Sequence, residues 1–248
     1  MSGHSKWATI KRKKGALDAK RGKLFTKLIK ELNVAARMGG GDPSSNARLR
    51  TAIATAKGLS MPGDTIKNAV KRGAGEMEAT NFEDVVYEGT GPNGTLFLVE
   101  GATDNRNRTV AEIRKIFEKN NGNLGGAGVA LWAFDRKGLV ILEKGSATED
   151  QLMEIGVGAG ADDYADDGDV WSLTSSPDAL QGVLDALEGA KIPVKASQLA
   201  FIPKNKKQVT GREAEVLINL VDILDDHDDV AHVYADFDVS DEELAKIS

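Results

Sequence analysis

The chain has 248 residues, enough for more than one packed core, and its 41% hydrophobic and 28% charged residues are typical of a globular protein. It contains no cysteine, which excludes disulfide bonds and thiolate metal sites and fits a reducing compartment. No apolar run approaches the roughly 18 residues of a membrane span, and the start MSGHSKWATIKRKK lacks the apolar core of a secretory signal. We therefore expect a cytoplasmic protein with no membrane partner.

The net charge of −6 conceals a strong asymmetry along the chain. Residues 1–80 carry 17 lysines and arginines against 6 acidic residues, a net of +11, whereas residues 81–248 carry 15 against 32, a net of −17. A solvated basic surface without a partner is one interpretation. However, ten of the first thirty residues are basic and only Asp18 is acidic, which favours binding of a polyanion such as nucleic acid.

Residues 1–80 are predicted to form a helical bundle. From residue 16 to residue 38 apolar residues recur at helical spacing, and a separate lysine stripe runs along the same helix at Lys20, Lys23, Lys27 and Lys30. The glycines at 39–41 end this helix. A second helix carries Leu49, Ile53 and Ala56, and a third begins near Pro62 and ends at Gly73.

Beyond residue 80 the apolar period changes from that of a helix to that of strands. The predicted elements are strands at 85–87 and 96–99 joined by a turn at 91–94, a helix at 111–117, and a strand at 129–134. Residues 135–204 follow the order βαββαβ, which is typical of a ferredoxin-like domain. A helix at 216–224 and a strand at 230–237 end the chain, and they cannot bury their faces alone.

These elements predict an α+β multidomain protein. The basic helical domain is 1–80, a discontinuous α+β middle domain comprises 81–134 and 205–248, and the ferredoxin-like domain 135–204 is inserted into it. Three consecutive domains are the alternative arrangement.

The sequence shows no pattern typical of an enzyme. It lacks the phosphate-binding motif of nucleoside triphosphatases and the nucleophile elbow of hydrolases. His227 lies among the acidic residues of 225–229, which we interpret as a solvated turn rather than a metal site. The aspartates within 162–169 do not match a calcium loop, and we expect them at a polar hairpin edge. We predict no catalytic residue, metal, cofactor or small-molecule substrate.

Two segments are candidates for nucleic-acid binding. The first combines the N-terminal basic block with the cationic helix, and its candidate residues are Lys6, Trp7, Lys11, Arg12, Lys13, Lys14, Lys20, Arg21, Lys23 and Lys27. Trp7 can stack on an exposed base, or it can pack on the first helix. In the second segment, 103–109, Asn105 or Asn107 can cap a helix, and Arg106 and Arg108 can either bind an anion there or pair with acidic neighbours.

These segments also carry a resemblance to a known family. The strings GHSKWATIKRKKGALDAKRGKLFTKLIKEL, AARMGGGDP, MPGDTIKNAVKRGAG, YEGTGPNGT, TDNRNRTVAEIR and DDVAHVYADFDV occur in order, with GNLG at 122–125. Over nearly the whole chain they resemble the YebC family of bacterial proteins, which also includes mitochondrial translational activators. The resemblance implies three domains, one of them inserted and ferredoxin-like, and neither a catalytic residue nor a cofactor.

The resemblance implies two functions that the charge pattern alone does not separate. Members are generally described as DNA-binding transcriptional regulators, and some act as translation factors that bind ribosomal RNA and relieve stalled ribosomes. We expect a nucleic-acid-binding regulator of gene expression, with DNA as the first candidate partner and the ribosome as the second. An enzyme and a protein-only adaptor are the remaining hypotheses.

Overall fold

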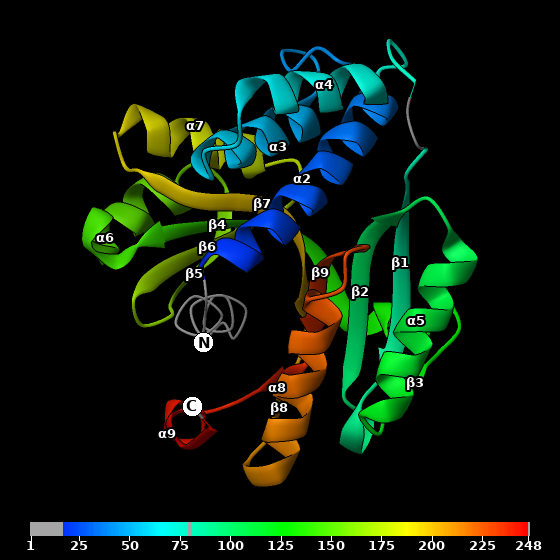
Figure 1. Ribbon diagram of the computed structural model, residues 1–248. Coiled ribbons are helices and arrows are strands. Elements are labelled where there is room, and N and C mark those ends of the chain that lie inside the picture. Colours follow the sequence, from blue (N-terminus) through cyan, green and yellow to red (C-terminus); the bar gives the residue numbers. More distant parts are fainter. Residues whose placement is uncertain (1–16, 79–80, 248) are drawn as a thin grey trace. The chain divides into compact units, whose positions relative to one another are not determined.

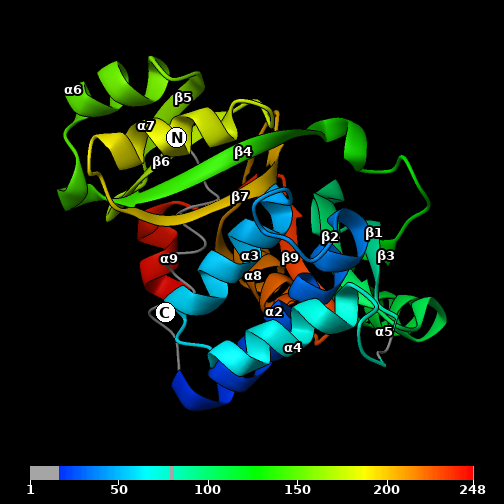
Figure 2. The same ribbon diagram turned by 90° about the horizontal axis from the view of Figure 1, so that it is seen from above.

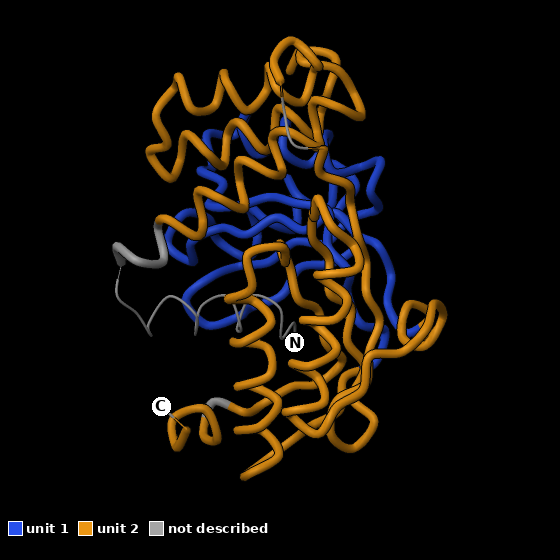
Figure 3. The backbone as a smooth tube through the Cα atoms, turned by 45° about the vertical axis from the view of Figure 1, so that its right-hand side comes forward, with its two compact units in different colours: residues 1–15, 133–205 blue, residues 16–132, 206–248 orange. Residues whose placement is uncertain are grey.

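The computed structural model describes residues 17–78 and 81–247 and has a mixed α+β architecture, as the sequence predicts (Figure 1). The described residues divide into two compact units (Figure 3). One unit contains 133–205, and the other contains 17–132 together with 206–247. The division of the larger unit into a helical domain and an α+β domain stays a prediction.

The larger unit begins with three helices, visible together in Figure 2: α2 (Leu17–Gly39), α3 (Ala47–Gly58) and α4 (Gly63–Gly73). Their apolar faces share one core that includes Leu32, Leu49 and Ile66. Asn46 caps α3 by accepting a hydrogen bond from the Leu49 amide at 3.1 Å. Its side chain also donates to the Ala35 carbonyl at 2.8 Å, so this one residue fixes the start of α3 against α2.

A four-stranded sheet follows in the same unit, with strand order β3-β1-β2-β9. The elements are β1 (Glu83–Thr90), β2 (Leu96–Thr103), α5 (Arg106–Lys119), β3 (Asn123–Leu124), α8 (Gly211–Asp225) and β9 (Val230–Ala235). Smaller elements are the turn η1 (Pro92–Gly94), the parallel pair β8 (Lys207–Gln208) and β10 (Phe237–Asp238), and α9 (Asp241–Ile247). Every pairing in the four-stranded sheet is antiparallel.

Helices α5 and α8 pack against each other and against one face of this sheet (Figure 1). The ring of Phe97 on β2 meets Phe117 of α5 edge to face, with centroids 5.6 Å apart. A Cβ at Gly89 of β1 would lie 2.7 Å from the Phe117 ring, so glycine is needed for this close packing. The pairing of β2 with β9 brings the C-terminal segment into the same sheet as β1 and β2.

The predicted strand at 129–134 is wrong. The structure has a single 3-10 turn, η2 (Leu131–Ala133), and the next strand begins at Phe134. The reason is Glu88, whose buried carboxylate accepts hydrogen bonds from the amides of Gly128, Ala130 and Leu131 at 2.6–2.8 Å. Because a side chain satisfies these donors, they are not available to a strand ladder.

The smaller unit contains a second antiparallel sheet, with strand order β5-β6-β4-β7. Its elements are β4 (Phe134–Glu143), η3 (Lys144–Ser146), α6 (Glu149–Gln151), the π-helical segment η4 (Leu152–Val157), β5 (Ala161–Asp166), β6 (Val170–Ser175), α7 (Leu180–Gly189) and β7 (Val194–Pro203). Val140, Leu173 and Val183 belong to its buried core. The chain order is strand, helix, strand, strand, helix, strand.

The aspartates of 162–169 lie at the edge of this sheet, as expected, because β5 is a terminal strand. Asp162 pairs with Lys137 at 2.7 Å, and Asp166 pairs with Lys144. Asp167 is buried and accepts a hydrogen bond from Ser172 at 2.6 Å. Charged side chains at an exposed edge disfavour pairing with another chain.

Among the described residues, none of the helices has the length and apolar character needed to cross a membrane.

The close crossing of α2 and α4 gives the first prediction. A Cβ at Gly73 would lie 2.2 Å from the Asn33 carbonyl oxygen and 2.9 Å from the Ala36 side chain. We expect Gly73→Ala to lower the free energy of unfolding by about 1–3 kcal/mol, because the helices must separate. Gly63→Ala in the same helix is the control, since a Cβ there meets nothing within 4 Å. Denaturant unfolding of both variants measures the difference, and equal stabilities would contradict the packing.

Candidate nucleic-acid interface

The structure describes only part of the predicted interface. The candidates Lys6, Trp7, Lys11, Arg12, Lys13 and Lys14 lie outside the described residues. Lys20 and Arg21 belong to α2, but the description does not extend to their side chains. The side chains of Lys23, Lys27, Arg106 and Arg108 are described, and all four have acidic or carbonyl partners in the larger unit.

The described lysines of the stripe contact the acidic turn, which we define as residues 225–229, between α8 and β9. Lys23 pairs with the Asp226 carboxylate at 2.6 Å. Lys27 donates a hydrogen bond to the main-chain carbonyl of Asp225. Lys30 donates to the Asp228 carbonyl at 2.9 Å and pairs with the Asp229 carboxylate at 2.5 Å. The stripe therefore neutralises the acidic C-terminal end of α8.

The arginines of 103–109 are also paired. Asn105 caps α5 by accepting a hydrogen bond from the Arg108 amide at 3.0 Å, which confirms one of the two predicted caps. Arg106 pairs with Glu83 at 2.8 Å. Arg108 contacts Asp104 at 2.8 Å and Asp229 at 3.0 Å. In this structure both arginines follow the ion-pair interpretation.

Asp229 is the most heavily coordinated acid described in the acidic turn. Its side chain is only 4% exposed. Besides Lys30 and Arg108, Thr109 donates a hydrogen bond to it at 2.6 Å. Burial alone would raise the pKa of Asp229, but the hydrogen bonds from Lys30, Thr109 and Arg108 outweigh burial and hold its pKa well below the usual range. The interpretation of 225–229 as a solvated turn is therefore wrong for Asp229.

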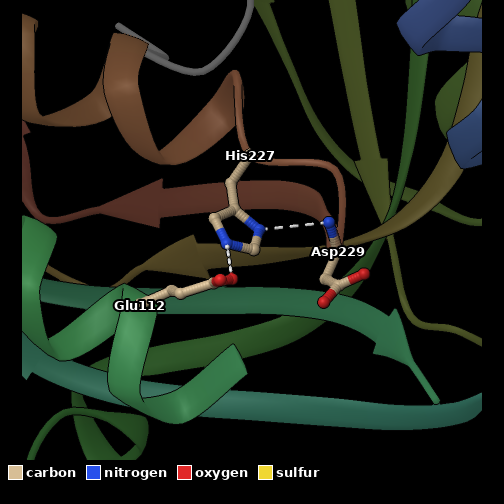
Figure 4. Close-up of side chains that lie close together, drawn as sticks. All are labelled: Glu112, His227 and Asp229. Atoms are coloured by element: carbon tan, nitrogen blue, oxygen red, sulfur yellow. Dashed lines mark hydrogen bonds and ion pairs between the residues drawn. The ribbon is translucent and has the colours of Figure 1, made fainter. Parts of the chain in front are cut away.

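His227 lies beside Asp229 and Glu112, and these three residues are spaced closely enough to hold a metal ion (Figure 4). The Asp229 amide donates a hydrogen bond to His227 Nδ1 at 3.1 Å, so the ring proton belongs on Nε2, which lies 3.0 Å from the Glu112 carboxylate. Asp229 is already paired with two cations. Because a metal would have to displace these contacts, the cluster suits an internal hydrogen-bonded hub better than a metal site.

A different set of cations lies on α4 and was not among the predicted site residues. Lys67, Lys71 and Arg72 are exposed, and within the described residues no ion pair joins them to an acid. We call these three residues the cationic face of α4. They lie opposite the buried Ile66, Ala69 and Gly73. The 3.6-residue period of segment 62–73 contains the signal that separates these two faces.

Comparisons with known proteins agree with the resemblance of the sequence. A model described as the TACO1/YebC protein N-terminal domain matches residues 5–76, and one described as the TACO1/YebC second and third domain matches 82–237. A protein of Solibacter usitatus is 52% identical and one of Geobacter sulfurreducens 51% identical, with 100% of each chain covered. Both are named as probable transcriptional regulatory proteins.

A solved structure is also similar. The crystal structure of a conserved hypothetical protein from Aquifex aeolicus superposes with a TM-score of 0.86 at 40% sequence identity. The superposition covers 92% of this chain and 95% of that chain.

The buried position of Asp229 gives the second prediction. We expect Asp229→Asn to lower the free energy of unfolding by about 3 kcal/mol at neutral pH, because Lys30 and Arg108 lose their shared acid. The lowered pKa means that Asp229 stabilises the fold fully above its unfolded pKa of about 3.9 and loses this effect as pH falls below it. The wild type should therefore lose more stability than the variant on acidification to about pH 3.

Denaturant unfolding at several pH values measures this difference. Asp228→Asn is the control, because it removes the same charge from an exposed position of the same turn. Its unfolding free energy should stay within about 0.5 kcal/mol of the wild type. Parallel pH profiles for wild type and Asp229→Asn would contradict the assignment.

Proposed function

The chain belongs to the TACO1/YebC family, and from this premise we propose that it is a nucleic-acid-binding regulator of gene expression that acts on DNA as a transcriptional regulator. The observation that carries the proposal is the cationic face of α4, whose three cations make no ion pair with an acid within the described residues. The +11 net charge of residues 1–80 and the names of the relatives support it.

The proposed interface combines the cationic face of α4 with the N-terminal basic block. Lys67 and Lys71 are one helical turn apart, so both can contact one phosphate chain. Lysine and arginine contacts with phosphates release counterions and provide affinity without reading the base sequence. Trp7 would add stacking only where a base is exposed. The segment 47–73 carries no sequence pattern of a helix-turn-helix, so we propose weak sequence specificity.

The remaining residues would keep the nucleic acid at one end of the protein. Residues 81–248 carry a net charge of −17, which repels a long polyanion. We propose that the segment from β4 to β7 is a ferredoxin-like domain inserted into the α+β domain. Its chain order βαββαβ and its strand order β5-β6-β4-β7 support this proposal. We propose a binding role for it rather than a catalytic one, with no cofactor and no small-molecule substrate.

The third prediction tests the cationic face of α4. Binding of a labelled mixed-sequence DNA duplex is measured at several salt concentrations. We expect Lys67→Gln with Lys71→Gln to weaken binding and to reduce the slope of log affinity against log salt by about two, because each phosphate contact contributes about 0.9. The control is Lys115→Gln with Lys119→Gln, which removes two exposed lysines at the same spacing from α5.

Equal slopes for the two double variants would refute the α4 interface. Unlabelled random DNA serves as competitor against a promoter fragment. If random DNA competes equally well, the protein does not select its site by base sequence. Substitution of Lys11, Arg12, Lys13 and Lys14 by glutamine measures how much the N-terminal block contributes to the DNA affinity and to its salt dependence.

The second candidate function is a translation factor on the ribosome. The observation that favours it is the charge distribution, because a basic end and an acidic remainder suit docking on ribosomal RNA at one point. Such a protein should co-sediment with ribosomes at low salt and be released as salt rises. The Lys67→Gln, Lys71→Gln variant should co-sediment less than the α5 control. A wild-type protein that stays in the supernatant at low salt would exclude this candidate.

A further inference from the structure

The contact between the lysine stripe and the acidic turn differs in exposure from one end to the other. At the inner end, the side chains of Lys30 and Asp229 are 12% and 4% exposed. At the outer end, those of Lys23 and Asp226 are 45% and 63% exposed. An exposed ion pair contributes little to stability, whereas breaking a buried one is costly. The outer end can therefore open while the inner end stays closed.

The acidic turn offers oxygen acceptors to the lysines of α2, as the phosphate groups of a nucleic-acid strand would. Lys23 meets the Asp226 carboxylate, and Lys27 meets the main-chain carbonyl of Asp225 at the C-terminal end of α8. Lys30 meets the main-chain carbonyl of Asp228, later in the acidic turn. This helix end carries partial negative charge, and Asp226 adds a full charge beside it. A phosphate oxygen can replace the Asp226 carboxylate at Lys23 without changing the charge balance of the lysine.

We propose that the acidic turn is an internal competitor for nucleic acid, which covers Lys23 and Lys27 until a phosphate chain displaces its outer end. This inference rests on the proposed function and adds regulation to the same basic region. Lys20 and the N-terminal basic block precede Lys23 in the sequence, so displacement adds Lys23 and Lys27 to the cations that follow this block. The buried pair Lys30–Asp229 keeps the turn attached while Asp226 moves away.

Asp226→Asn tests the proposal. The substitution keeps the size of the side chain and removes the charge that holds Lys23. Binding of a labelled mixed-sequence DNA duplex, measured from about 50 to 200 mM salt, should tighten several-fold at the lowest salt. The slope of log affinity against log salt should steepen by about 0.9, which corresponds to one additional phosphate contact.

Two matched variants separate competition from a general loss of negative charge. Asp228→Asn removes the same charge from the same turn, and within the described residues the Asp228 carboxylate has no hydrogen-bonded lysine. It should steepen the slope less than Asp226→Asn. Lys23→Gln combined with Asp226→Asn should return the slope to the wild-type value. Thermal unfolding confirms that each variant is folded.

The outcomes distinguish this inference from the proposed function. If the wild type binds, Lys67→Gln with Lys71→Gln weakens binding, and Asp226→Asn behaves like Asp228→Asn, the internal competitor alone is overturned. If Asp226→Asn still tightens binding when Lys23 is glutamine, the competition for Lys23 is also overturned. If neither the wild type nor any variant binds DNA at low salt, the proposed function fails and this inference fails with it.

Discussion

The larger unit depends on one buried carboxylate. Asp229 receives contacts from Lys30 of α2, Arg108 and Thr109 of α5, and Thr103 at the end of β2. Isolated charges are not stable in a protein interior, so the acid and its cations must be buried together. Asp229 thus connects α2 of the helical segment with α5 and the end of β2. It also directly precedes β9 of the same sheet. These contacts of Asp229 also hold the acidic turn in place, because Asp229 is its last residue.

A second group of ion pairs, which is more exposed to solvent, also joins the helical segment to the α+β segment. Arg48 of α3 pairs with Glu31 of α2 at 2.7 Å and with Asp84 of β1 at 2.7 Å. Hydrogen bonds with these two acids raise the pKa of Arg48 further above its already high ordinary value. Because Arg48 is 39% exposed, its contacts are worth less than those of Asp229. The helical segment is therefore joined to the sheet by one buried and one exposed cluster of opposite charges.

The helices and most strands could be predicted from the sequence because their signals are local. The period of residues 16–38 was sufficient for α2. The predicted helix at 111–117 lies within α5 but begins five residues after its start at Arg106, although Asn105 was one of the two candidate caps. The strand at 129–134 was wrong because Glu88, some 40 residues away, captures the amides of that segment. No pattern within 129–134 indicates this capture.

The candidate site was harder to predict because charge pairing is not local. Lys23 and Asp226 are 203 positions apart, so a single sequence shows two solvated charges where the structure has a pair. The basic stripe and the acidic run at 225–229 were each visible, but their contact was not. The exposed face of α4 could have been found from the helical period of segment 62–73. The positive charge of this helix is visible in the sequence, but the predicted site residues were drawn mainly from the N-terminal block, which has the higher density of charge.

These contacts change the meaning of the +11 net charge of residues 1–80. Lys23, Lys30 and Arg48 each form an ion pair with an acid of the α+β segment. Part of the excess of basic residues is therefore neutralised within the protein. Composition alone therefore overstates the charge that an external polyanion meets. A cation that is available for binding differs from a structural one in making no ion pair within the protein. Among the described residues Lys67, Lys71 and Arg72 of α4 meet this condition, as do Lys115 and Lys119 of α5. Affinity for nucleic acid then depends on the few cations left uncovered, and on whether a ligand can compete for those that are covered.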